Sequence, residues 1–147
     1  MSVEPRFIDQ VRCLILKDPR AKALNEALSP SDRKFFNGFL MTVVAVLVTP
    51  RLGAECTAEE LAAFSDEVAA SQRKERRPVN EFVIEEIVRY IYGKPQLFAT
   101  VPVPPAAVST AGAAIVRHIR DREPYVVDNV DSVLAAAEQL HKKLNQG

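Results

Sequence analysis

The sequence has few of the residues on which most enzyme sites are built. Its 147 residues include two histidines, two cysteines and five scattered glycines. There is no glycine-rich phosphate loop, no Gly-x-Ser-x-Gly turn and no Cys-x-x-Cys pair. The composition therefore argues against catalysis and predicts no cofactor, although an enzyme that uses an acid cluster or a cysteine stays open.

The chain also has no excess of either charge. Lys plus Arg and Asp plus Glu both number 19, so the formal net charge is zero. Proteins that bind nucleic acids usually carry a positive excess. A helix-turn-helix would need residues 80–92 as its recognition helix, and that segment is mostly apolar. We therefore expect no nucleic-acid partner, while a neutral chain repels its own copies weakly and permits self-association.

Cysteine is too scarce for a disulfide framework. The two thiols, Cys13 and Cys56, are far apart in the sequence. The N-terminal residues are polar and lack the hydrophobic segment of a secretory signal. These features predict a cytoplasmic protein with reduced thiols, and the spacing does not say whether the two cysteines are close in space.

One apolar run stands out, at residues 35–49. It is shorter than the roughly 20 residues that a membrane-spanning helix needs. We expect it to form a buried central helix that ends at Pro50 and Gly53, and we expect no membrane association.

Helical periodicity is present from one end of the chain to the other, whereas no alternating strand pattern stands out. Start signals for helices occur at Ser29-Pro30, Thr57, Asn80 and Asp128. Thr57 begins a Ser/Thr-x-x-Glu capping box, which is the most specific of these signals.

The predicted fold is all-α, a compact single-domain bundle of about six helices over residues 1–147. The apolar central helix should be buried by the others. A helix that begins near residue 105 should end at Pro124, and the final helix should begin at Asp128. An irregular, proline-rich strap is expected at about residues 95–105.

Histidine spacing gives only half of a metal-binding motif. Glu138 and His141 have the Glu-x-x-His spacing of di-iron bundles, but Ile115 stands where His118 would need an acid. A solvated face, rather than a haem pocket, is indicated for His118 by its neighbours Arg117, Arg120 and Arg122. We therefore predict neither a metal nor a haem.

Two groups of residues are candidate binding sites. An apolar ligand pocket would be lined by Phe39, Phe82, Tyr90, Tyr92 and Arg89. A patch for an anion or a protein partner would contain Arg73, Lys74, Arg76, Arg77, Arg117 and Arg120. The acidic residues of the same region, Glu81, Glu85 and Glu86, are expected to form a surface ion-pair stripe with Arg89.

The leading functional hypothesis is a non-catalytic cytoplasmic protein–protein interaction module, which could form a homodimer. Residues 35–49 and 82–92 are apolar almost all round, and two such helices are hard to cover in one small bundle. The alternative is a helical sensor that encloses a small apolar ligand in an aromatic-lined pocket. An enzyme of unknown class is the second alternative.

Overall fold

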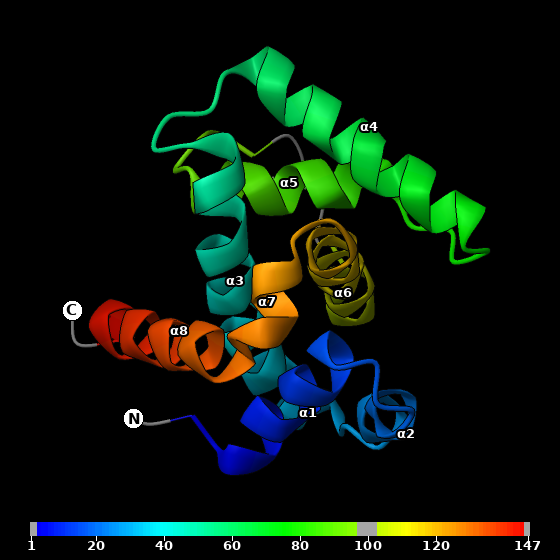
Figure 1. Ribbon diagram of the computed structural model, residues 1–147, viewed down its shortest axis with the longest axis vertical. Coiled ribbons are helices and arrows are strands. Elements are labelled where there is room, and N and C mark those ends of the chain that lie inside the picture. The colour runs from blue at the N-terminus through cyan, green and yellow to red at the C-terminus, as the bar shows by residue number, and fades with distance from the viewer. Residues whose placement is uncertain (1–2, 97–102, 146–147) are drawn as a thin grey trace.

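Residues 3–96 and 103–145 are described by the computed structural model, and they form eight α-helices without a strand (Figure 1). In chain order the helices are α1 (Pro5–Ile15), α2 (Arg20–Glu26), α3 (Pro30–Leu52), α4 (Ala58–Lys74), α5 (Glu81–Ile91), α6 (Pro105–Arg122), α7 (Pro124–Asp128) and α8 (Val130–Asn145). The all-α prediction is confirmed. The count exceeds about six, and the helix that the sequence did not predict is the short α7, with 5 residues. The strap predicted at about 95–105 falls mostly outside the described residues.

Helix α3 runs through the middle of the molecule, with α4 and α5 at one end and α1 and α2 at the other (Figure 1). Nine of its 23 residues are buried, and Phe39, Leu40 and Val43 are wholly inaccessible to solvent. It packs most extensively on α6 and α8, and it also meets α1 and α5. Within the described ranges it is the one helix long and apolar enough to cross a membrane, a property that the core helix of a globular bundle shares.

Helix α3 does not end at Pro50, as the sequence predicted, but continues to Leu52. A proline lacks one N–H donor, so near the end of a helix it removes a single hydrogen bond. The surrounding turn is otherwise closed, because Thr49 Oγ1 donates to the Ala45 carbonyl at 2.8 Å and the Gly53 N–H donates to the Thr49 carbonyl at 2.8 Å. The predicted end at Gly53 is correct, since this residue is the C-cap with φ of 87°.

The connection after α6 contains the helix that the sequence did not predict. Pro124 was expected only to end α6, and it also begins α7 because its fixed φ suits the first helical turn. Glu123 is extended, as a residue before proline tends to be, and so separates the two helices. Asp128 is consequently the last residue of α7 rather than the cap of the final helix, which begins at Val130.

Three predicted helix starts are confirmed by their hydrogen bonds. The Ser29 hydroxyl accepts from the Asp32 N–H at 3.1 Å, and the Asn80 side chain caps α5. Thr57 and Glu60 form the reciprocal capping box, at 3.1 and 3.2 Å. Each bond satisfies a backbone donor that a helix start leaves free, so these local residues fix where α3, α4 and α5 begin.

Helix α6 lies close to α3 because it presents glycine at their contact. A Cβ atom added to Gly112 would lie 2.8 Å from Leu40 Cδ2, 3.0 Å from Met41 Cε and 3.2 Å from Leu40 Cγ. Leu40 is fully buried and has no room to withdraw. Gly38, in contrast, has no atom within 4 Å of such a Cβ.

We expect Gly112→Ala to lower the free energy of unfolding by about 1 kcal/mol, because overpacking costs about 1–3 kcal/mol and removing a helical glycine regains about 1 kcal/mol. The matched control Gly38→Ala should raise it by about 0.5–1 kcal/mol through helix propensity alone. Urea unfolding of both variants, followed by circular dichroism, measures the difference. Equal stabilisation by the two substitutions would contradict a close contact between α3 and α6.

Candidate functional site

The predicted aromatic pocket residues do not face one common space. Phe39 is fully buried in the core, whereas Phe82 is 61% exposed and Tyr90 is 65% exposed. The Tyr92 hydroxyl donates to the Gly53 carbonyl at 2.7 Å, and Arg89 lies 3.9 Å from Glu85 on its own helix. None of these side chains lines the large cleft described below. Helical spacing placed the aromatic residues on different sides of α3 and α5.

The acidic residues of α5 differ from the predicted surface stripe. Glu86 is only 5% exposed, and the paired side chains of Glu85 and Arg89 are 17% and 19% exposed. The pair is therefore largely covered, and α5 presents less charge to solvent than its sequence suggests.

Half of the predicted basic patch gathers at one cleft. Its volume is about 700 Å³, and its lining comes from α1, α2, Phe36 of α3, the C-terminal end of α4 and one face of α6. We call it the basic cleft after the five cations that line it, which are Lys17, Lys22, Arg77, Arg117 and Arg120. The other predicted residues, Arg73, Lys74 and Arg76, are exposed and do not line it.

The floor of the basic cleft is a single face of α6. Ser109, Ala113, Arg117 and Arg120 line it, and a spacing of three to four residues places them along one side of a helix. At a rise of about 1.5 Å per residue, this stripe is about 17 Å long. The stripe begins with a hydroxyl, passes a small apolar side chain and ends in two cations. The end at Arg117 and Arg120 is positive, and at the other end the Arg33 guanidinium donates to Ser109 Oγ at 3.0 Å.

Most charges at the positive end are already engaged. Arg120 is 9% exposed and donates to the Leu14 carbonyl at 2.7 Å and to Asp121 at 3.0 Å. Lys17 lies 3.5 Å from the same Asp121 carboxylate. Asp18 lines the cleft and is paired at 2.9 Å with Arg20, which does not line it.

Arg77, Arg117 and Lys22 differ, because they lack a carboxylate partner in the part of the chain that the structure describes. Arg117 Nε donates to Gln72 Oε1 at 3.1 Å, which fixes the guanidinium plane and leaves both terminal amino groups without a protein acceptor. Burial, together with the nearby charges of Arg77 and Arg120, lowers the pKa of Arg117 to about 10. The group remains a cation at neutral pH, and a bound anion would stabilise its charge.

The wall opposite α6 holds a polar side chain that is nearly buried and unpaired. Gln10 on α1 is only 5% exposed, lines the basic cleft and forms no side-chain hydrogen bond within residues 3–96 and 103–145. The amide atoms reach the cleft and are free to bond a ligand there.

Cys13 also lines the basic cleft and is 4% exposed. Burial and the nearby Asp18 carboxylate raise the pKa of its thiol. The side chain is therefore a neutral thiol at pH 7 and contributes an apolar surface to the wall. Cys56 is likewise a buried free thiol, against the start of α4.

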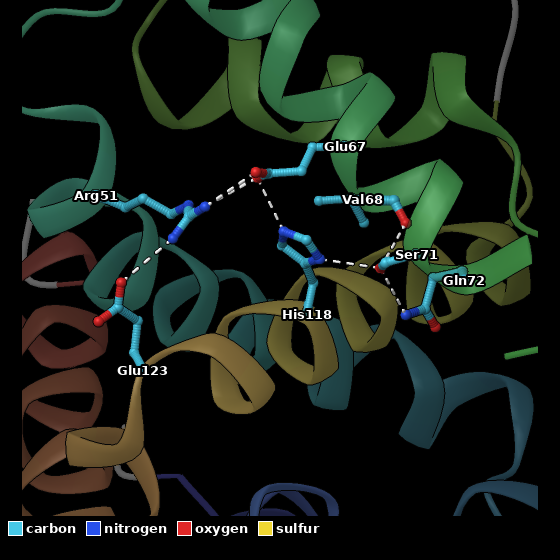
Figure 2. Close-up of polar contacts among 7 residues, drawn as sticks. All are labelled: Arg51, Glu67, Val68, Ser71, Gln72, His118 and Glu123. Carbon is cyan, nitrogen blue, oxygen red and sulfur yellow. Dashed lines mark hydrogen bonds and ion pairs between the residues drawn. The ribbon is translucent and has the colours of Figure 1, made fainter. Parts of the chain in front are cut away.

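The prediction of a solvated His118 is wrong. The side chain is 1% exposed and lies between α4 and α6, as Figure 2 shows. Its Nε2 is 2.9 Å from Glu67 Oε2, and its Nδ1 is 2.9 Å from Ser71 Oγ. The three arginines near it in sequence point elsewhere on α6, because a helix turns neighbouring residues to different sides.

The hydrogen bonds around His118 continue in both directions (Figure 2). Arg51 on α3 holds the Glu67 carboxylate at 3.0 and 3.2 Å and reaches Glu123 at 3.2 Å. On the other side, Gln72 Nε2 donates to Ser71 Oγ at 3.4 Å. The network therefore ties α3, α4 and α6 together, and through Gln72 it meets Arg117 at the basic cleft.

The contacts of Ser71, His118 and Glu67 resemble the serine, histidine and acid of a hydrolase triad only in composition. The Ser71 hydroxyl has one proton, which can be donated either to the Val68 carbonyl at 3.0 Å or to His118 Nδ1 at 2.9 Å. Neither Ser71 nor His118 lines the basic cleft, so a substrate in that cleft would not reach them. Their arrangement fits a structural clamp between helices.

The sequence contained no signal for this clamp, because its partners are 47 and 51 residues from His118. The sequence did contain the three arginines of the basic cleft, but nothing in it distinguished these three from the other three cations of the predicted patch. Scanned against models of known protein families, the chain matches none, and no curated protein or solved structure is significantly similar to it.

Proposed function

We propose that this protein is a non-catalytic binding domain that takes a small anionic molecule in the basic cleft. The observation that carries the proposal is Arg117, a half-buried cation whose terminal amino groups face no protein acceptor and whose neighbour Arg77 is also unpaired. A guanidinium held in this way can offer two parallel hydrogen bonds to a carboxylate or a phosphate.

The dimensions of the cleft favour a small molecule. A volume of about 700 Å³ lies within the range of roughly 300–1,000 Å³ that is typical of ligand pockets. Its walls combine apolar side chains, such as Leu14 and Phe36, with a larger number of polar ones, of which Gln10 and Arg117 have unused hydrogen-bonding capacity. Such a combination provides burial for the body of a ligand and orientation for its charge.

The interaction module expected from the sequence stays a prediction. The large exposed apolar side chains are distributed over several helices rather than confined to one, and they include Leu16 of the α1 C-cap, Phe35 of α3, Tyr125 of α7 and Leu144 of α8. Single exposed apolar side chains are ordinary in monomeric proteins. The cleft therefore offers a more specific basis for function than any surface patch.

The test is isothermal titration calorimetry of the protein with phenyl phosphate, benzoate and uncharged benzyl alcohol, which measures the affinity for each compound. At least one anion should bind, and benzyl alcohol should not. Arg117→Gln and Arg77→Gln should each weaken that binding by at least about tenfold, the effect expected for losing a charged hydrogen bond.

The matched control is Arg73→Gln, which removes the same charge from an exposed residue outside the cleft and should leave the affinity within about twofold. Arg77 has no side-chain partner, so its variant tests the site even if the Arg117 variant does not fold. Absence of anion binding, or equal losses in the Arg73 and Arg77 variants, would refute the proposal.

A further inference from the structure

Resting on the proposed function, we infer that the ligand is a small phosphate monoester, with its dianionic phosphate at Arg77 and Arg117 and its uncharged body along the α6 floor toward Ser109. The inference depends on three features of the basic cleft, which are its charge balance, the polarity of its floor and the neutral groups of its opposite wall.

The charge balance favours a dianion. Five cations line the basic cleft against three carboxylates, Asp18, Glu75 and Asp121, which leaves an excess of two positive charges. Asp18 and Asp121 are already held by arginines, so they do not oppose an incoming anion fully. A phosphate monoester carries close to two negative charges at neutral pH, whereas a carboxylate or a sulfate ester carries one.

The positions of the free donors fit a tetrahedral group. Arg117 offers its two terminal amino groups, with the guanidinium plane fixed by Gln72. Arg77 lines the same cleft, and its charge adds to the burial that lowers the pKa of Arg117. Two guanidinium groups can thus share three phosphate oxygens, whereas the two oxygens of a planar carboxylate can use only one such fork fully.

The remainder of the cleft suits a body without charge. Beyond Arg117 the floor passes Ala113 to Ser109, and Phe36 lines the same space. Ser109 Oγ donates to Asn37 Oδ1 and accepts from Arg33, so its hydroxyl is satisfied, and Arg33 also donates to Asn25 at 3.0 and 2.9 Å. The unpaired amide of Gln10 can donate and accept, which suits a hydroxyl or carbonyl on the body of the ligand.

The decisive experiment compares phenyl phosphate with phenyl sulfate, two ligands of nearly the same shape that differ by one negative charge. At about pH 7.5 the phosphate should bind at least about tenfold more tightly. At about pH 5 the phosphate is mostly a monoanion, since its second pKa is about 6, and the preference should fall to about twofold or less. The ratio of the two affinities cancels any change in the protein itself.

Ala113→Leu tests the position of the body. The added side chain fills the middle of the floor, so it should weaken phenyl phosphate by at least about fivefold while inorganic phosphate changes by less than about twofold. Thermal unfolding of this variant should match the unmodified protein, because Ala113 is only partly buried.

The outcomes separate the two proposals. If neither ester binds and benzoate does not bind either, the proposed anion-binding function is wrong; if benzoate alone binds, only the phosphate assignment is wrong. If both esters bind equally at pH 7.5, the basic cleft binds anions but the phosphate assignment is wrong. If Ala113→Leu weakens inorganic phosphate as much as phenyl phosphate, the ligand body does not lie along α6 and that part of the inference is overturned.

Discussion

Replacing Phe39 with alanine is expected to lower the free energy of unfolding by about 4 kcal/mol, the largest effect of any single change considered for this protein. The side chain is wholly buried on α3, and its ring also meets the edge of His141, at 6.5 Å between centroids. Its removal loses the burial of an aromatic ring and leaves a cavity that the surrounding helices fill only in part.

The matched control is Phe35→Ala, one turn earlier on the same helix. Phe35 is 60% exposed, so its removal should change the free energy of unfolding by less than about 0.5 kcal/mol. Urea unfolding monitored by circular dichroism measures both variants under one condition. Similar losses in the two variants would mean that α3 is covered on the Phe35 side as well, as it would be in a homodimer.

Lowering the pH from about 7 to about 5 is expected to destabilise the protein through His118. Burial lowers the pKa of this histidine, and the Glu67 carboxylate opposes that shift without reversing it. The unfolded histidine titrates near 6.5, so below this pH the unfolded chain binds a proton that the folded protein resists. Stability is therefore full above about pH 6.5 and falls toward the lower folded pKa, by at most about 1.4 kcal/mol per pH unit.

The variant His118→Gln isolates this effect. A glutamine amide can donate to Glu67 and accept from Ser71 but does not titrate, so the decline between pH 6.5 and about pH 5 should disappear even though the variant is less stable overall. The other charged groups near the ring are Glu67, Arg51 and Arg122. Arginines do not titrate in this range, and the ordinary pKa of Glu67 is 4.5, below the window. An unchanged decline in the variant would assign the effect to other groups.

The sequence predicted the elements whose causes are local. The capping bonds of Ser29, Thr57 and Asn80 involve residues within three positions, and a helix start of this kind can be recognised from spacing alone. Pro124 shows the limit of such reasoning. A proline can end one helix and begin another, and the prediction for Pro124 included only the first of these properties.

The candidate site depended on contacts that spacing does not encode. Arg77 and Arg117 are 40 positions apart along the printed sequence, and only the packing of α4 against α6 brings their charges together. Arg73 and Arg76 were predicted with them on composition, but their directions from the helix end leave them outside the basic cleft. His118 was misjudged for the same reason, because its neighbours in sequence are cations while its neighbours in space are Glu67 and Ser71.

The glycine contact between α3 and α6 has a consequence for recognition. One side of α6 is locked against the core at Gly112, while the other side is the floor on which a ligand would rest. Movement of the floor toward α3 would press on the fully buried Leu40, so we expect the floor to stay in place if a ligand binds as proposed. Binding should then require little rearrangement of the protein and should select ligands by their shape.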